Sequence, residues 1–160
     1  MNSEYIIKLG IDQAQKTMRE NIGGPFGAVI IDENGKILSV ASNTVLGSHD
    51  PTAHAEINAI REACKNIGSH DLSGCVLYTT GYPCPMCLSA IIWAKIKTVY
   101  FGCTPQDADK IGFRDDFIYK FIKNNCTETQ ILDIQALSQS ERNKCLDLFT
   151  EYTNTNKQIY

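Results

Sequence analysis

The sequence lacks any apolar run close to the roughly 20 residues that a membrane-spanning helix needs. Its first ten residues contain Glu4 and a single Lys8 but no long apolar stretch, so they do not have the features of a signal peptide. We therefore expect no membrane partner and a cytoplasmic location.

An excess of positive charge is also missing. The 160 residues carry a formal net charge of -3, and the sequence pI is about 5.6. A surface that grips nucleic-acid phosphates is usually basic, so this balance argues against a nucleic-acid partner.

The chain contains no internal repeat, no low-complexity tract and no linker rich in Gly, Ser or Pro. Its hydrophobic content of 43% and charged content of 21% are ordinary for a globular protein. A length of 160 residues suits one domain with one sizeable core. We therefore predict a single domain over residues 1–160.

Cysteine is present, but not in the pattern of a disulfide framework. There are seven cysteines, an odd number, and two of them fall in a Cys-x-x-Cys motif. The other five stand singly, and we expect them to be reduced and mostly buried, as in a cytosolic protein. They are Cys64, Cys75, Cys103, Cys126 and Cys145.

Apolar periodicity and turn residues predict an α/β chain. A strand, a short helix and a strand in the middle of the chain imply a right-handed parallel crossover within a mixed sheet. Helices are expected over residues 3–21, 53–67, 84–95 and 117–123 and from Ser138 onward, and strands over residues 26–31, 37–43, 75–80, 97–102 and 131–134.

The most informative feature is His54-Ala55-Glu56 followed by Pro83-Cys84-Pro85-Met86-Cys87. A structural zinc site is normally closed by four protein ligands, whereas a catalytic one keeps three and leaves a position for water. His54, Cys84 and Cys87 make three, and no second His/Cys cluster follows nearby to close the site. Glu56 is then a spare carboxylate, placed to move protons to and from the activated water.

The predicted helix starts suit this chemistry. Free backbone N–H groups and the helix dipole favour the thiolate form of Cys84 and Cys87. Two thiolates and one neutral imidazole leave Zn²⁺ formally neutral, and the metal still lowers the pKa of a bound water toward neutrality. Glu56 can accept the proton of that water and can deliver protons, one after the other, to the substrate nitrogen and the departing amine.

Other interpretations account for less of the pattern. A redox pair leaves His54 and Glu56 unexplained, and a structural zinc knot lacks a fourth ligand. A zinc-stabilised binding module, or an inactive subunit of a hetero-oligomer, would not need the Glu56 carboxylate. The conjunction of both motifs at two predicted helix starts favours a hydrolytic enzyme.

His-x-Glu followed by Pro-Cys-x-x-Cys is the signature of zinc nucleobase deaminases. With Pro25-Phe26-Gly27-Ala28, Asn43 and Thr52-Ala53, it makes the chain resemble the cytidine deaminase superfamily over its first two-thirds. The resemblance implies a three-layer α/β/α sandwich around a five-stranded mixed sheet, with Zn²⁺ as cofactor between two helix starts.

The last third resembles the bacterial guanine deaminase family, through residues 112–120 and the terminal Tyr160. This resemblance implies a homodimer in which the C-terminal segment, about residues 105–160, is exchanged between subunits, and the terminal tyrosine helps to close the partner's pocket. The implied reaction converts guanine and water to xanthine and ammonia. Zinc-bound hydroxide attacks C2 of the base and Glu56 shuttles protons.

Residue chemistry and the resemblance together suggest substrate contacts. Asn43 offers a donor and an acceptor to the edge of a base, although it also suits the end of a strand. Phe26 could stack on the base or pack in the core. Trp93 could wall the pocket, join the dimer interface or lie in the core. The full set of expected substrate-binding residues is Phe26, Asn43, Ala55, Trp93, Asp115 and Tyr160.

One position departs from the family pattern. Many relatives have an acidic residue directly before Pro-Cys-x-x-Cys, and here Tyr82 occupies that place. Cytosine, another aminopurine or an aminotriazine therefore remain alternative substrates. An adenosine in tRNA is a further alternative, but it needs a basic face. The available lysines, such as Lys120 and Lys123, are interspersed with aspartates.

Overall fold

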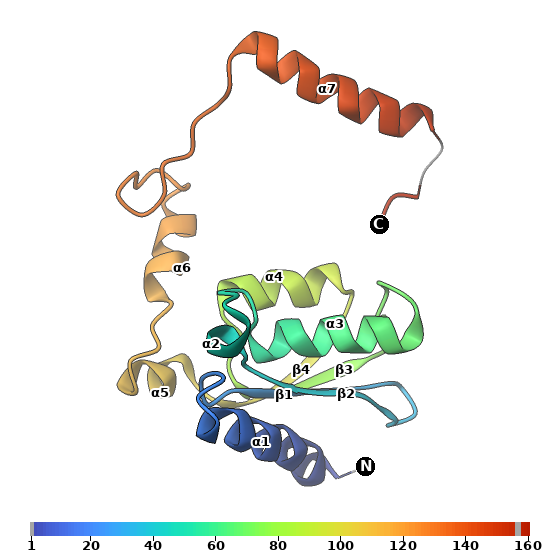
Figure 1. The fold of residues 1–160 in the computed structure, drawn as a ribbon, viewed down its shortest axis with the longest axis vertical. Coiled ribbons are helices and arrows are strands. Elements are labelled where there is room, and N and C mark those ends of the chain that lie inside the picture. The colour runs from blue at the N-terminus through green and yellow to red at the C-terminus, as the bar shows by residue number, and fades with distance from the viewer. Residues whose placement is uncertain (1, 156–157) are drawn as a thin grey trace. The chain divides into compact units, whose positions relative to one another are not determined.

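The computed structural model describes residues 2–155 and 158–160 as two compact units, Met1–Tyr119 and Lys120–Tyr160. The first unit is a mixed sheet between layers of helices (Figure 1). The assignment of residues 1–160 to a single domain remains a prediction. The helices are α1 (Ser3–Arg19), α2 (Val45–Ser48), α3 (Ala55–Ile67), α4 (Pro85–Trp93), α5 (Pro105–Lys110), α6 (Asp116–Lys123) and α7 (Gln139–Asn154), and the strands are β1 (Gly27–Ile31), β2 (Ile37–Ser42), β3 (Val76–Gly81) and β4 (Thr98–Cys103).

The sheet has the order β2-β1-β3-β4, and β1 runs antiparallel to both of its neighbours. β3 and β4 are parallel and are connected through α4, as the strand–helix–strand pattern predicts. The expectation of five strands is wrong for this sheet, which has four strands among the described residues. Residues 131–134, the expected fifth strand, form a turn and irregular chain. An isolated extended segment has no ladder to satisfy its backbone, so β-branched residues alone do not make a strand.

Helices cover both faces of the sheet, which gives the predicted α/β/α sandwich (Figure 1). α1 packs on one face, where Ile6 meets Val29 and Ile31 of β1. α3 and α4 cover the other face, where Ala59 and Ala63 belong to the larger core cluster. The alternation of side chains along each strand serves these two cores separately.

The helices that begin near the zinc motif start one or two residues later than predicted. His54 is the N-cap of α3 and Cys84 is the N-cap of α4, and both have extended backbone. Neither side chain caps its own helix. The ligand side chains therefore stand at the helix ends and are not tied into the helices. Gly68 ends α3 in the left-handed conformation, with φ of 68°, as its place after the apolar run predicts.

Gly27 allows α1 to approach β1 closely, because a Cβ at this position would lie 2.0 Å from the carbonyl oxygen of Gly10. We expect Gly27→Ala to lower the free energy of unfolding by about 2 kcal/mol or more, since backbone must move to relieve the overlap. Gly10→Ala is the matched control, because its Cβ would meet Gly27 at an ordinary 3.4 Å. It should be neutral or stabilising by up to ~1 kcal/mol, as alanine favours the helix. Urea unfolding followed by circular dichroism measures both; equal stability of the two variants would contradict the close approach.

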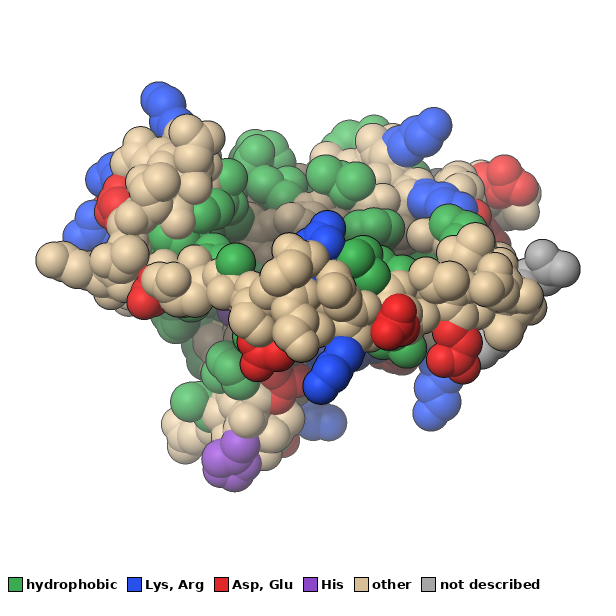
Figure 2. Space-filling model, turned by 90° about the horizontal axis from the view of Figure 1, so that it is seen from above, with side chains coloured by type: hydrophobic (Ala, Val, Ile, Leu, Met, Phe, Trp, Pro, Cys, Tyr) green, Lys and Arg blue, Asp and Glu red, His purple; other side chains and the backbone are tan. Residues whose placement is uncertain are grey.

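The second unit is dominated by α7. This helix begins with a capping box formed by Ser138 and Glu141, at the position where the sequence predicts a helix start. Its apolar side chains include Leu148 and Phe149, which are 64% and 68% exposed. Figure 2 shows green hydrophobic side chains at the surface among the charged ones. Large exposed apolar groups on a helix indicate a surface that another molecule covers.

All seven cysteines are free thiols, in agreement with the expectation of reduced cysteines. The expectation that the five single ones are mostly buried is wrong, since Cys103, Cys126 and Cys145 are exposed. Among residues 2–155 and 158–160, none of the helices has the length and apolar character that crossing a bilayer requires.

Candidate active site

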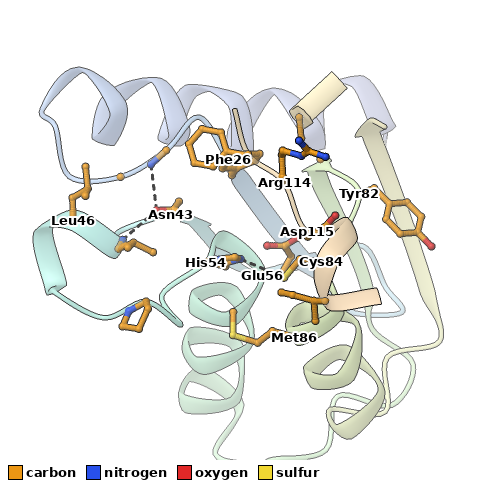
Figure 3. A pocket seen from close by; sticks show the side chains of 18 residues that line it. Phe26, Asn43, Leu46, His54, Glu56, Tyr82, Cys84, Met86, Arg114 and Asp115 are labelled. Atoms are coloured by element: carbon orange, nitrogen blue, oxygen red, sulfur yellow. Dashed lines mark hydrogen bonds between the residues drawn. The ribbon is translucent and has the colours of Figure 1, made fainter. Parts of the chain in front are cut away.

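A cavity of about 650 Å³ opens in the first unit beside the starts of α3 and α4 (Figure 3). Its wall is mostly apolar, and a few polar groups converge in it, as in sites for small ligands. The polar and charged residues in the wall are Asn43, His54, Glu56, Tyr82, Cys84, Arg114 and Asp115; the rest are Gly23, Gly24, Phe26, Val45, Leu46, Pro51, Gly81, Met86, Ala108, Phe113 and Ile118.

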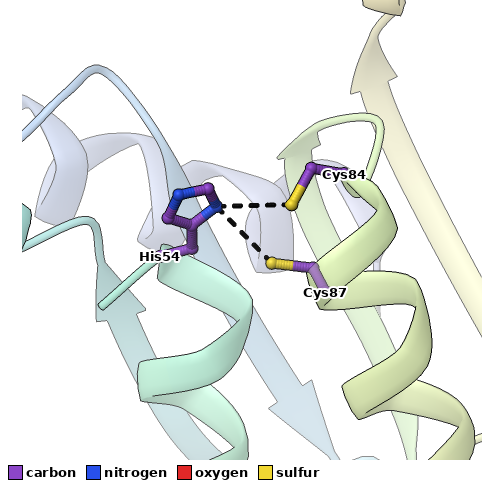
Figure 4. Close-up of side chains that lie close together, drawn as sticks. All are labelled: His54, Cys84 and Cys87. Carbon is purple, nitrogen blue, oxygen red and sulfur yellow. Dashed lines mark hydrogen bonds between the residues drawn. The ribbon is translucent and has the colours of Figure 1, made fainter. Parts of the chain in front are cut away.

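His54, Cys84 and Cys87 meet at one edge of this cavity. The Nδ1 atom of His54 lies 3.5 Å from Sγ of Cys84 and 3.6 Å from Sγ of Cys87 (Figure 4). All three donor atoms lie within 4.8 Å of one another. Zn–N and Zn–S bonds of ordinary length at a tetrahedral angle separate N and S by about 3.6 Å. The spacing of the donors therefore fits zinc, as the motif predicts.

The protonation of the two thiols also fits a metal site. Cys87 donates to the Cys84 sulfur, and His54 lies beside it, so the pKa of Cys84 is well below the usual thiol range. The same shared proton, together with burial and the neighbouring Glu56 carboxyl, raises the pKa of Cys87. The pair thus gives up one proton readily and holds the second. A cation bound to both sulfurs would take the place of that second proton.

Glu56 lies in the first turn of α3 and is 6% exposed. Burial is the main cause that raises the pKa of its carboxyl. Its Oε2 atom is 3.5 Å from Sγ of Cys87, and its Oε1 atom is 3.4 Å from Oγ1 of Thr79. The carboxyl therefore stands next to the ligand cluster, as the two-residue spacing from His54 predicts.

Asn43 is held in one orientation by the backbone around it. Its Oδ1 atom accepts hydrogen bonds from the N–H groups of Gly24 at 3.2 Å and Val45 at 3.1 Å (Figure 3). The chain can come this close because residue 23 is glycine: a Cβ there would lie 1.9 Å from the carbonyl oxygen of Asn43. With Oδ1 occupied, the amide presents its Nδ2–H group as a donor.

Two aromatic rings form another part of the wall. The centroids of Phe26 and Phe113 are 5.0 Å apart, and the rings meet edge to face at 89°. The next two residues, Arg114 and Asp115, also line the cavity. Arg114 forms ion pairs with Asp109 at 3.0 Å and with Asp116 at 3.4 Å.

Asp115 brings a second carboxyl to the cavity. Burial, followed by the charge of Cys84, raises the pKa of this group. Figure 3 shows the Asp115 side chain close to Glu56 and Cys84, at the ligand end of the cavity. The cavity therefore has acceptors at this end and the Asn43 donor at the other side.

Comparison with known proteins agrees with this geometry. The family model for the cytidine and deoxycytidylate deaminase zinc-binding region matches residues 1–103, a span that includes all three donors and Glu56. The chain belongs to this deaminase family. It is a hydrolytic deaminase with zinc as its cofactor.

Individual relatives narrow the position of this deaminase within the family. Guanine deaminase of Bacillus subtilis strain 168 is 47% identical over 131 residues, which cover 82% of this chain and 83% of the relative. The crystal structure of guanine deaminase from Bacillus subtilis superposes with a TM-score of 0.90 at 43% identity and covers 100% of this chain and 99% of that one. The tRNA-specific adenosine deaminase of Aquifex aeolicus is 42% identical over 64% of this chain and 66% of its own length.

The deaminase cavity contains three of the six expected substrate contacts: Phe26, Asn43 and Asp115. Ala55 is buried as the first residue of α3 and is not part of the wall. Trp93 ends α4 and is 72% exposed, so it is neither in the core nor in the wall of this cavity. Tyr160 belongs to the second unit and is 76% exposed.

Tyr82 lies at the rim of the deaminase cavity, where the sequence places it. Its ring points away from His54 and Glu56 (Figure 3) and meets Phe101 edge to face, with centroids 5.0 Å apart. The sequence does not single out Phe113, Arg114, Leu46 or Met86 as wall residues. The signal for the first two is their position directly before Asp115 in the segment that resembles guanine deaminases.

Proposed function

We propose that this deaminase hydrolyses a free nucleobase and that its substrate is guanine, which it converts to xanthine and ammonia. The observation that carries this proposal is the similarity to guanine deaminase of Bacillus subtilis over the whole chain, including the C-terminal segment.

We assign the zinc ligands to His54, Cys84 and Cys87, on the spacing and protonation of their donor atoms. When bound, zinc lowers the pKa of a coordinated water and so supplies a nucleophile at neutral pH. Three protein donors leave room for that water, as catalytic zinc sites do. The cavity beside the cluster is where the base would lie.

We assign the proton shuttle to Glu56. The carboxyl is buried beside the ligand cluster. Its pKa is raised toward neutral pH, which favours a group that both accepts and donates a proton. It can accept one proton of the attacking water and deliver it to the ring nitrogen of the base. It can then take the second proton from the same oxygen and pass it to the amino group, which leaves as ammonia. These proton transfers require no carrier besides Glu56.

Recognition of the base would divide between a donor and an acceptor. The Nδ2–H group of Asn43 is oriented toward an acceptor, and guanine offers a carbonyl oxygen and ring nitrogens. Asp115 would accept from N–H groups of the base. Phe26, supported by Phe113, would contact the flat face of the ring. The backbone N–H of Ala55 lies in the first turn of α3, where N–H groups have no partner within the helix.

We further propose a cytoplasmic homodimer that exchanges its C-terminal segments. In the first unit β4 is an edge strand, and apolar side chains near it are exposed, including Ile92 and Trp93 of α4. In the second unit the apolar side chains of α7 are exposed as well. Burial of both surfaces in a second copy would remove an open edge and two apolar patches. Trp93 would then lie at the interface, and Tyr160 would close the partner's cavity.

The charge around the cavity supports a free base over tRNA. Among the residues of the wall, Arg114 carries the positive charge, and it is paired with Asp109 and Asp116. A polynucleotide would need several unpaired cations for its phosphates.

A substrate panel tests the proposal. Zinc-loaded protein is incubated with guanine, cytosine, adenine, 2,6-diaminopurine, an aminotriazine, cytidine and a tRNA, and ammonia release is followed. We expect guanine to give the highest kcat/KM, by at least about 10-fold, because it meets both the donor and the acceptor of the cavity. Ultraviolet spectra should show xanthine as the product. Turnover of cytosine or tRNA without turnover of guanine would replace the proposed substrate.

A further inference from the structure

Thr79 is a polar residue in an apolar part of the sheet. Side chains alternate along β3, and Leu77, two residues earlier on the same face, belongs to the core beneath α3 and α4. Thr79 is 1% exposed. A buried hydroxyl is unfavourable unless it forms hydrogen bonds, and valine has the same shape without that requirement. Core packing alone therefore does not explain why residue 79 carries a hydroxyl.

Its contacts point to Glu56. The Oγ1 atom of Thr79 is 3.0 Å from the carbonyl oxygen of Gly81 and 3.4 Å from Oε1 of Glu56. The Gly81 carbonyl comes from the same strand and, like Oε1 of Glu56, can accept the one proton of the hydroxyl. The second contact joins Thr79 to a helix 23 residues away in the sequence. It lies on the side of the carboxyl opposite to Oε2, which faces Cys87.

Bound zinc would change the contact between Cys87 and Glu56. The Sγ atom of Cys87 lies 3.5 Å from Oε2 of Glu56, but a zinc-bound thiolate has no proton to donate to it. Among the described side chains, Thr79 would then be the one within hydrogen-bonding reach of the Glu56 carboxyl. A hydroxyl also accepts, so it can pair with the carboxyl whether or not the carboxyl carries a proton.

We propose that Thr79 is a positioning residue, which holds the Glu56 carboxyl through Oε1 so that Oε2 stays directed at the reacting atoms. This inference rests on the proposed role of Glu56. Thr79 is not itself one of the residues that line the cavity, and it reaches the site through Glu56. Its effect is on the geometry of proton transfer and not on binding of the base.

Thr79→Val tests this role, with the base that the substrate panel identifies as the best substrate. We expect kcat to fall by about 10-fold or more, the range for a lost hydrogen bond to a charged group, while KM stays within about twofold. Zinc content should remain that of the unsubstituted protein. Thr79→Ser, which restores the hydroxyl, should recover most of kcat. If Thr79→Val does not fold, the pair Thr79→Ser and Thr79→Ala isolates the same hydroxyl.

Ser39→Ala is the matched control. Ser39 is also buried, and its hydroxyl also contacts α3, where it donates to the carbonyl oxygen of Ala59 at 2.9 Å. This variant should lose stability but keep kcat. A kcat of Thr79→Val within twofold of the unsubstituted protein would overturn the proposal, and so would an equal fall in Ser39→Ala or loss of zinc. A wrong substrate assignment is recognised separately, because the panel is measured on the unsubstituted protein.

Discussion

Glu56→Gln is expected to reduce turnover by at least about 100-fold and up to about 10,000-fold, the contribution of a general acid–base group. Glutamine keeps the shape of glutamate but cannot accept and return a proton. The residue is not one of the three donors that meet at the metal site, so the zinc content should be unchanged. Turnover is measured by ammonia release and zinc by elemental analysis of the same sample.

Glu62→Gln provides the control for this result. Glu62 is on the same helix but is exposed, so its replacement removes one carboxylate without touching the cavity. Its activity should equal that of the unsubstituted protein. Loss of zinc from Glu56→Gln would show that the carboxyl supports the metal and is not a shuttle alone. Full activity of that variant would exclude the shuttle role.

The zinc site could be predicted from the sequence because its geometry is local. His54 and Glu56 are two residues apart, and Cys84 and Cys87 are three apart, so each pair has a fixed spacing once a helix starts there. The remaining step, that two helix starts meet, follows from the parallel crossover of β3 and β4.

The remainder of the cavity depends on contacts that no short pattern contains. Phe113 joins the wall because it meets Phe26, 87 residues away, edge to face. Asn43 looks in the sequence like the last residue of a strand. Only the approach of Gly24 and Val45 to its Oδ1 atom determines which end of the amide is presented. Short helices such as α2 and α5 also escape prediction, since four to six residues show too little periodicity.

The errors in the last third of the chain have one physical origin. The pattern of residues 131–134 suits a strand, and the apolar residues of α7 suit a buried face. In the described structure residues 131–134 form a turn and irregular chain, and the apolar side chains of α7 are exposed. Patterns of this kind predict that a segment can pair or be buried. They do not predict whether its partner belongs to the same chain or to another molecule. The exposure of Cys126 and Cys145 in the same unit has the same explanation if a second copy covers it.

Truncation after Leu137 is therefore expected to abolish the dimer and to lower activity by at least about 10-fold in one step. The deletion removes α7 and Tyr160, and with them the apolar side chains that the proposed exchange buries. Light scattering at a fixed protein concentration measures the mass of the particle, and ammonia release measures activity. Lys144→Gln, an exposed substitution within α7, is the control and should change neither quantity.

Mixing two inactive chains makes this test specific for exchange. The truncated chain keeps its own His54, Cys84, Cys87 and Glu56, whereas full-length Glu56→Gln keeps its own C-terminal segment. If segments are exchanged, a heterodimer of the two has one site with an intact shuttle and an intact lid, because the full-length chain closes the cavity of the truncated one. Activity should then rise at least several-fold above the sum of the two chains, toward half that of the unsubstituted dimer. A truncated monomer with full activity would exclude the exchange, and so would a heterodimer that forms without any gain.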